Sequence, residues 1–77
     1  MPYTITPPQD GEIFAKMTHS NATNAVYFKP EEISAYGDKV VIVTQRGTVL
    51  EIKASEMESP SGTAQEVAAA IAAFFRA

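Results

Sequence analysis

The sequence has no cysteine and only one histidine, His19. Without thiols the chain can form neither disulfides nor thiolate-based zinc sites. His19 lies in a polar stretch, and its nearest carboxylates in the sequence are Asp10 and Glu12, so we expect a solvated loop residue and not a metal ligand. The sequence therefore predicts no metal site and no cofactor. In a chain of 77 residues, oligomerisation is the remaining common source of extra stability.

The chain also lacks a cluster of positive charge and a long apolar run. Its six basic residues are dispersed, nine acidic residues give a net charge of −3, and the longest apolar run covers only residues 67–75. A nucleic-acid surface needs clustered cations, and a membrane span needs roughly 20 apolar residues. No secretory signal pattern is visible at residues 1–3. We therefore expect a cytoplasmic protein that binds neither nucleic acid nor membrane.

Motifs for catalysis are missing as well. There is no P-loop, dinucleotide-binding glycine pattern or nucleophile elbow, and no nucleophile has a base at a recognisable spacing. Glu31 and Glu32 are adjacent, so in a strand they point to opposite faces and cannot act as a carboxylate pair. The sequence predicts no catalytic residue, no small-molecule substrate and no enzymatic activity.

Residues 33–54 carry the strongest structural pattern, a β-meander. Gly37 and Asp38 suit a two-residue hairpin loop, and Gly47 suits the third position of a three-residue loop with a bulge. Both turns independently predict registers that place the same six apolar residues on one face. These residues are Ile33, Ala35, Val40, Ile42, Leu50 and Ile52.

The opposite face of the meander is not simply polar. It carries Val41, Val43 and Val49 beside Ser34, Glu51 and Lys53. Three valines are too many for a fully solvated face, so we expect a cover. The candidates are another chain or the aromatic residues of the N-terminal strands, which are Phe14, Tyr27 and Phe28.

The segments before the meander predict an arm and two strands. Residues 1–11 contain three prolines, which favours an extended arm outside the central strands. The arm is either a frayed terminus or a segment that docks on a neighbouring subunit through Tyr3 and Ile5. Residues 12–17 and 25–29 are predicted strands, joined by a polar loop at 18–24.

After the meander we expect a linker at 55–62 and a helix over 63–76. Thr63 and Glu66 form a capping box, and the body is rich in alanine. Val67, Ile71, Phe74 and Phe75 recur at helical spacing, so this stripe should pack on the six-residue face. Two adjacent phenylalanines do not both fit a narrow stripe, which makes Phe75 a candidate for contact with a partner.

These elements predict an α+β fold. We expect a small antiparallel sheet of about five strands, with the meander at its centre and one C-terminal helix packed on one face. The arm, residues 1–11, precedes a single domain, residues 12–77. The candidate interface residues are Tyr3, Ile5, Val41, Val43, Val49 and Phe75.

Residues 25–75 resemble small proteins of tailed-phage structural gene clusters. The resemblance rests on a "V-I-V" strand at 41–43, a "G-T-V-x-E-I" strand at 47–52 and an alanine-rich helix beginning at G-T-A-Q-E-V. It implies a structural or assembly protein, such as a capsid-decorating or connector subunit, that self-associates and is assembled into a virion from the cytoplasm. The alternative hypothesis is a small binding or regulatory module that engages or inhibits a protein partner.

Overall fold

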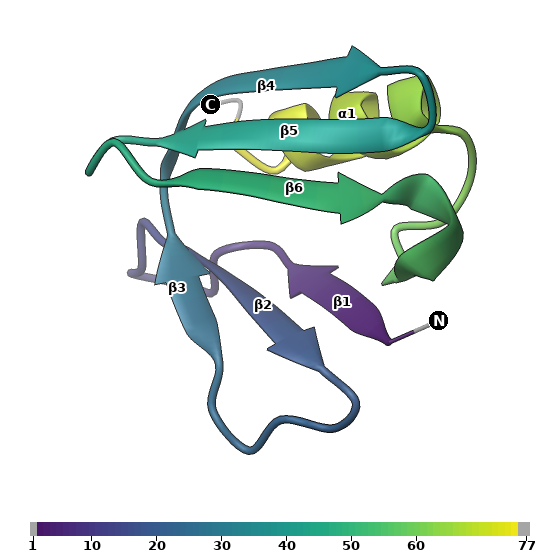
Figure 1. The fold of residues 1–77 in the computed structure, drawn as a ribbon. Coiled ribbons are helices and arrows are strands. Elements are labelled where there is room, and N and C mark those ends of the chain that lie inside the picture. Colours follow the sequence, from purple (N-terminus) through teal and green to yellow (C-terminus); the bar gives the residue numbers. More distant parts are fainter. Residues whose placement is uncertain (1, 76–77) are drawn as a thin grey trace.

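A computed structural model describes residues 2–75, which form two sheets and one α-helix (Figure 1). Sheet A has four strands in the order β3-β2-β1-β7, and sheet B has three in the order β4-β5-β6. Every neighbouring pair is antiparallel except β1 with β7. The elements are β1 (Tyr3–Thr6), β2 (Ala15–His19), β3 (Val26–Phe28), β4 (Pro30–Tyr36), β5 (Lys39–Thr44), β6 (Val49–Lys53), the 3₁₀ turn η1 (Ala54–Glu56), β7 (Met57–Ser59) and α1 (Ala64–Ala73). The α+β class is confirmed, but the single sheet of about five strands is wrong.

Sheet B is the predicted meander, in the predicted register. Ile33 pairs with Ile42, which in turn pairs with Leu50. Both turn glycines have positive φ, +59° at Gly37 and +87° at Gly47, a conformation that side chains with a Cβ rarely adopt. The turn geometry therefore sets which face of all three strands is apolar.

The chain divides into two sheets at the junction of Lys29 and Pro30. Only Lys29 separates β3 from β4, and the register of β4 shifts between Pro30 and Glu32. Proline has no N–H to continue a ladder, and an irregular register bends a strand. Strands that switch sheets at such bends form the corners of two-sheet folds, and the chain turns this corner in Figure 1.

The predicted N-terminal arm is wrong for Tyr3–Thr6. These residues form β1, which pairs with β2 on one side and with β7 on the other. The three prolines are at positions 2, 7 and 8, so they flank the strand and remove none of its N–H donors. Ile5 is 2% exposed and belongs to the core of its own chain, so it is not available to dock on a neighbouring subunit.

The predicted linker at 55–62 also contains structure. η1 leads into β7, which lies beside β1 as the one parallel pair among the described strands. Met57 at the start of β7 is 1% exposed. A single buried side chain between polar neighbours has no periodicity, which explains why the sequence pattern did not reveal this strand.

The helix begins where the capping box predicts. The Glu66 N–H donates to Thr63 Oγ1 at 3.2 Å, and the Thr63 N–H donates to Glu66 Oε1 at 2.9 Å. α1 ends at Ala73, and the predicted end at residue 76 lies outside the described residues. The helix packs against β4 and β5, as predicted. Val67 and Ile71 are fully buried there, while Phe74 and Phe75 are half-buried after its last turn.

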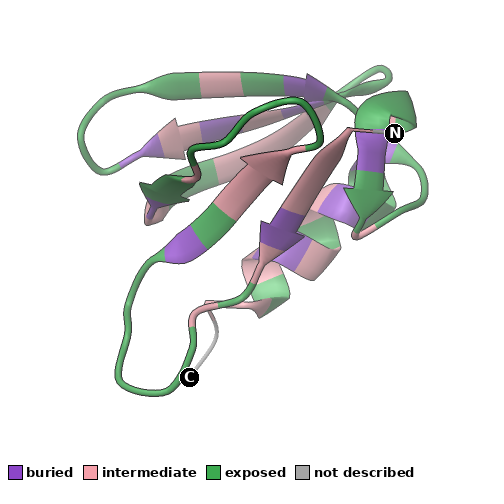
Figure 2. Ribbon diagram, turned by 90° about the horizontal axis from the view of Figure 1, so that it is seen from below, coloured by how far each residue is buried: buried purple, intermediate pink, exposed green. Residues whose placement is uncertain are grey.

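One core joins both sheets and the helix. Figure 2 shows buried segments on each of them. The inner face of sheet B, the side that carries Ile42, lies in the same cluster as α1 and sheet A. The buried apolar residues are Ile5, Ala15, Phe28, Val40, Ile42, Ile52, Met57, Ala64, Val67 and Ile71.

The core predicts a large effect of truncating Ile71. Because this side chain is fully buried, Ile71→Ala should lower the free energy of unfolding by about 2–5 kcal/mol. Gln65→Ala, an exposed change on the same helix, should stay within about 0.5 kcal/mol. Urea denaturation followed by circular dichroism measures both. Equal effects of the two changes would contradict the packing of α1.

The capping box predicts a pH dependence of stability. Hydrogen bonds from the Thr63 main chain and then its side chain hold the pKa of Glu66 below its ordinary value of 4.5. The folded-state pKa is lowered, so this stabilisation is present above pH 4.5 and is lost as the pH falls through the folded-state pKa. Glu66→Gln keeps a side chain that can reach the Thr63 N–H but removes the charge. It should therefore flatten the change of stability below pH 4.5.

The hydroxyl of the same box should matter at neutral pH. Thr63→Ala removes the acceptor for the Glu66 N–H and should cost about 1 kcal/mol. Urea denaturation of the variant measures the loss. An unchanged midpoint would contradict the capping geometry.

Candidate functional site

The ionisable side chains form no evident chemical centre in the described chain. Among residues 2–75, no group of three or more His, Asp or Glu side chains could hold a metal ion. The ring of His19 meets that of Tyr3 edge-on, with centroids 4.7 Å apart, and its Nδ1 accepts from the Asn21 N–H at 3.0 Å. His19 thus closes the turn after β2, and its role there is local. Over the same residues, no helix has the length and apolar character to cross a membrane.

The outer face of sheet B is the first candidate site, and we call it the valine face. It lies on the side of sheet B opposite α1, which is behind the sheet in Figure 1. Val41 and Val43 are half-buried, Val49 is 54% exposed and Tyr36 is 67% exposed. The valine face consists of Glu32, Ser34, Tyr36, Lys39, Val41, Val43, Val49, Glu51 and Lys53.

The predicted cover of this face by N-terminal aromatic residues is wrong. Phe28 is 3% exposed in the core on the other side of sheet B, and Phe14 and Tyr27 are themselves exposed. The corner at Pro30 explains the error, because it turns sheet A toward the inner face of sheet B, where both contribute to the core. None of the three valines belongs to the core or to the side chains that pack against it.

Charges of both signs border the three valines in an ordered way. Across the strands, one row is Glu32, Val43 and Val49, and the row at the other end is Tyr36, Lys39 and Lys53. The row between them ends in Glu51, whose carboxylate lies 4.0 Å from the Lys39 ammonium. One end of the face therefore carries one glutamate and two valines, and the other end carries two lysines.

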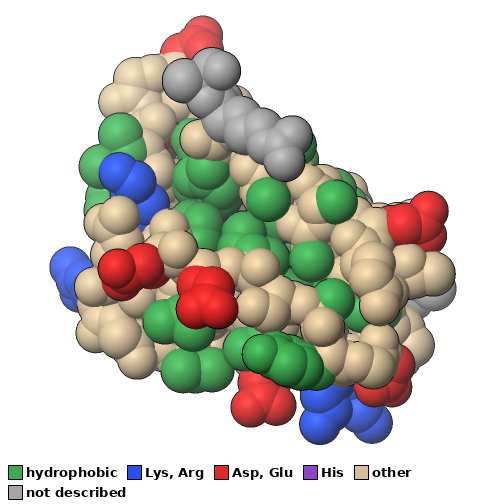
Figure 3. Space-filling model, turned by 90° about the horizontal axis from the view of Figure 1, so that it is seen from above, with side chains coloured by type: hydrophobic (Ala, Val, Ile, Leu, Met, Phe, Trp, Pro, Cys, Tyr) green, Lys and Arg blue, Asp and Glu red, His purple; other side chains and the backbone are tan. Residues whose placement is uncertain are grey.

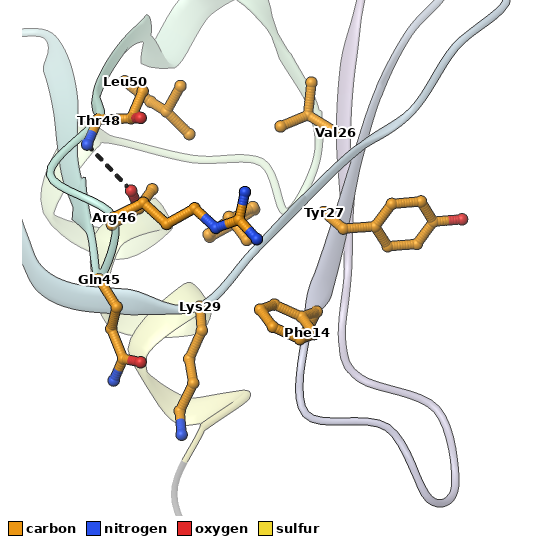
Figure 4. Close-up of a pocket in the computed structure, with 10 residues that line it drawn as sticks. Phe14, Val26, Tyr27, Lys29, Gln45, Arg46, Thr48 and Leu50 are labelled. Carbon is orange, nitrogen blue, oxygen red and sulfur yellow. Dashed lines mark hydrogen bonds between the residues drawn. The ribbon is translucent and has the colours of Figure 1, made fainter.

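A groove between sheet A and the β5–β6 turn is the second candidate site. Its volume is about 510 Å³, and its lining includes Phe14, Val26, Phe28, Lys29, Arg46 and Leu50. In Figure 4, Phe14, which directly precedes β2, and Val26 of β3 point into the space that Leu50 enters from β6. Phe14 and Val26 are 43% and 46% exposed, so the groove presents an open apolar surface.

Two basic residues, Lys29 and Arg46, are among those that line this groove. The Arg46 side chain extends from the turn toward β3, whereas Lys29, at the corner between the sheets, directs its side chain away from Arg46 (Figure 4). The one ion pair between residues 2–75 joins Lys39 and Glu51, so neither cation has a carboxylate partner in that part of the chain. The groove thus combines apolar side chains with unpaired positive charge.

A third, smaller hollow lies between β4 and α1. Figure 3 shows hydrophobic side chains gathered on this side of the molecule, with acidic side chains beside them. The hollow has a volume of about 230 Å³ and is lined by Pro30, Glu31, Glu32, Ile33, Ala72 and Phe75. The Phe75 ring packs near that of Phe28, with centroids 6.3 Å apart, so Phe75 takes part in packing within its own chain.

The structure brings only three of the six predicted interface residues together. Val41, Val43 and Val49 share the valine face. Tyr3 packs against the core and His19, and Ile5 is buried. The groove was not predicted, because its lining comes from segments far apart in the sequence. The one feature of the sequence that could have indicated the groove is Arg46, an arginine at the tip of a predicted loop.

Comparisons with known proteins give no relative: no family model, no curated protein and no solved structure matches this chain.

The registers predict which amides of the free strand edges exchange quickly. Thr44 N–H donates to the Thr48 carbonyl and Ala54 N–H to the Asp38 carbonyl, so even-numbered residues of β6 face β5. The amides of Val49 and Glu51 should therefore exchange with solvent much faster than that of Leu50. Hydrogen exchange followed by NMR measures this alternation. Uniform protection along β6 would contradict a free edge.

Proposed function

We propose that this chain is a non-enzymatic assembly protein that works through protein–protein contacts and pairs with a second copy through the valine face. The observation that carries the proposal is the position of Val41, Val43 and Val49 on an open sheet face, outside the core of their own chain. Removing apolar surface of this kind from water is favourable in free energy. A sheet face packed on a second sheet is a common way to bury it.

The charge pattern favours a second copy as the partner. In a two-fold pair the same patch meets itself, and an axis that runs across the strands places the end with Glu32 over the end with Lys39 and Lys53 of the second copy. Val41 in the middle row then meets its own copy at the centre, while Val43 and Val49 lie over the aliphatic stems of Lys39 and Lys53, and Glu32 approaches these ammonium groups. Such an arrangement is self-complementary, which a surface of one sign would not be.

The setting we propose is the virion or an assembly intermediate of a tailed phage. The support is the resemblance of residues 25–75 to small structural proteins of such phages, in which symmetric contacts between copies are the working principle. In that setting we propose that the protein is a capsid-decorating or connector subunit.

Sedimentation velocity over a wide range of protein concentration tests the pairing. The parent chain should form dimers, and Val49→Lys should shift the equilibrium to monomer because it places a charge among the apolar side chains of the contact. Val26→Lys adds the same charge on β3, away from this face, and should still dimerise. A parent chain that is monomeric at all concentrations would refute the proposal.

A monomeric binding module is the second candidate function. The observation that favours it is the open groove beside Lys29 and Arg46, which is separate from the valine face. Such a module would engage one partner protein without self-association. The effects of Val49→Lys and Val26→Lys separate the two functions, because each variant alters only one of the two surfaces.

A further inference from the structure

The main chain of β3 presents an unused pairing site beside the groove. Ser20 N–H donates to the Pro2 carbonyl, so the even-numbered residues of β2 direct their main-chain N–H and C=O groups toward β1. The main-chain groups of Ala15 and Met17 therefore point toward β3. Their partners are Phe28 and Val26, so the N–H and C=O of Tyr27 point to the free edge of sheet A. This edge is where an additional strand would pair.

Two further observations show that this edge faces the groove. The Lys29 carbonyl points to the same side of the chain as the main-chain groups of Tyr27. It accepts from the Gln45 N–H of the β5–β6 turn at 3.0 Å. Tyr27 borders the groove although its ring points away from it in Figure 4. Its main chain is therefore the part that borders the groove.

The side chains around this edge fit one face of an extended peptide. Residues two apart in a strand share a face, so a peptide paired with Tyr27 would direct positions i and i+2 into the groove. Phe14, Val26 and Leu50 form an apolar surface for one of them. Arg46 reaches into the groove in Figure 4, lacks a carboxylate partner among residues 2–75, and suits an acidic side chain at the other.

We propose that the groove binds an extended acidic peptide segment of a partner protein, which adds as a strand to the free edge of β3. The segment has an apolar residue two positions from an aspartate or glutamate. Main-chain hydrogen bonds to Tyr27 give affinity, and the two groove-facing side chains give specificity, as in other cases of strand addition. This site does not involve the valine face, so it does not depend on self-association.

The test uses the full chain and a pair of synthetic peptides with blocked ends. The probe contains Thr-Leu-Thr-Glu-Thr, and its control has Gln in place of Glu. NMR titration should show shifts at Phe14, Tyr27 and Arg46, with slowed exchange of the Tyr27 amide. The control peptide should bind roughly 2- to 5-fold more weakly, the effect of losing one exposed ion pair.

Variants of the protein test the charge independently of the fold. Arg46 is exposed at the tip of a turn, so Arg46→Gln should keep the spectrum of the free protein and lower the affinity for the Glu peptide roughly 2- to 5-fold. Lys53→Gln removes a cation from the valine face and should leave the affinity unchanged.

Three outcomes would overturn the proposal. The first is the absence of shifts at the groove with the Glu peptide. The second is equal affinity for the Glu and Gln peptides. The third is groove shifts that appear on raising the concentration of the protein alone, which would show that a second copy occupies the site. The Val49→Lys variant should bind the peptide as the parent does, so the failure of self-association and the failure of peptide binding give different results.

Discussion

Burial of one face of the β-meander is the constraint on which the rest of the structure depends. Two glycine turns put six apolar residues on that face, and α1 and sheet A enclose it within one core. A domain of this size is expected to have only a few kcal/mol of net stability, on the order of 3–5. It would therefore unfold if either α1 or sheet A no longer packed on this face. The N-terminal strand and the segment after β6 each contribute a buried side chain, Ile5 and Met57.

The corner at Lys29 and Pro30 links this core to the surface. Because the chain changes sheets there, sheet A joins the inner side of sheet B and leaves the valine face open. The same change of direction ends sheet A at β3 and leaves the groove beside the β5–β6 turn. Both proposed contact surfaces thus follow from how the core is closed, and they lie on different parts of the molecule.

The sequence predicted the local features well and the long-range ones poorly. The registers of the meander and the capping box of Thr63 and Glu66 depend on residues close in the chain, and both are confirmed. The four-stranded sheet A depends on pairing between β1 and β7, which are separated by most of the chain and carry no strong periodicity. The valines of the outer face could be predicted because alternation in one hairpin reveals them. The groove could not, because Phe14, Arg46 and Leu50 meet only after the corner at Pro30 has formed.

Native-state hydrogen exchange tests most directly whether one core holds both sheets. The slowest amides of β2 in sheet A and of β5 in sheet B should open with the same free energy, equal to that of global unfolding, because neither sheet can bury its apolar face alone. A free energy of opening for β2 well below that of β5 would show that sheet A unfolds by itself, and would contradict a single shared core.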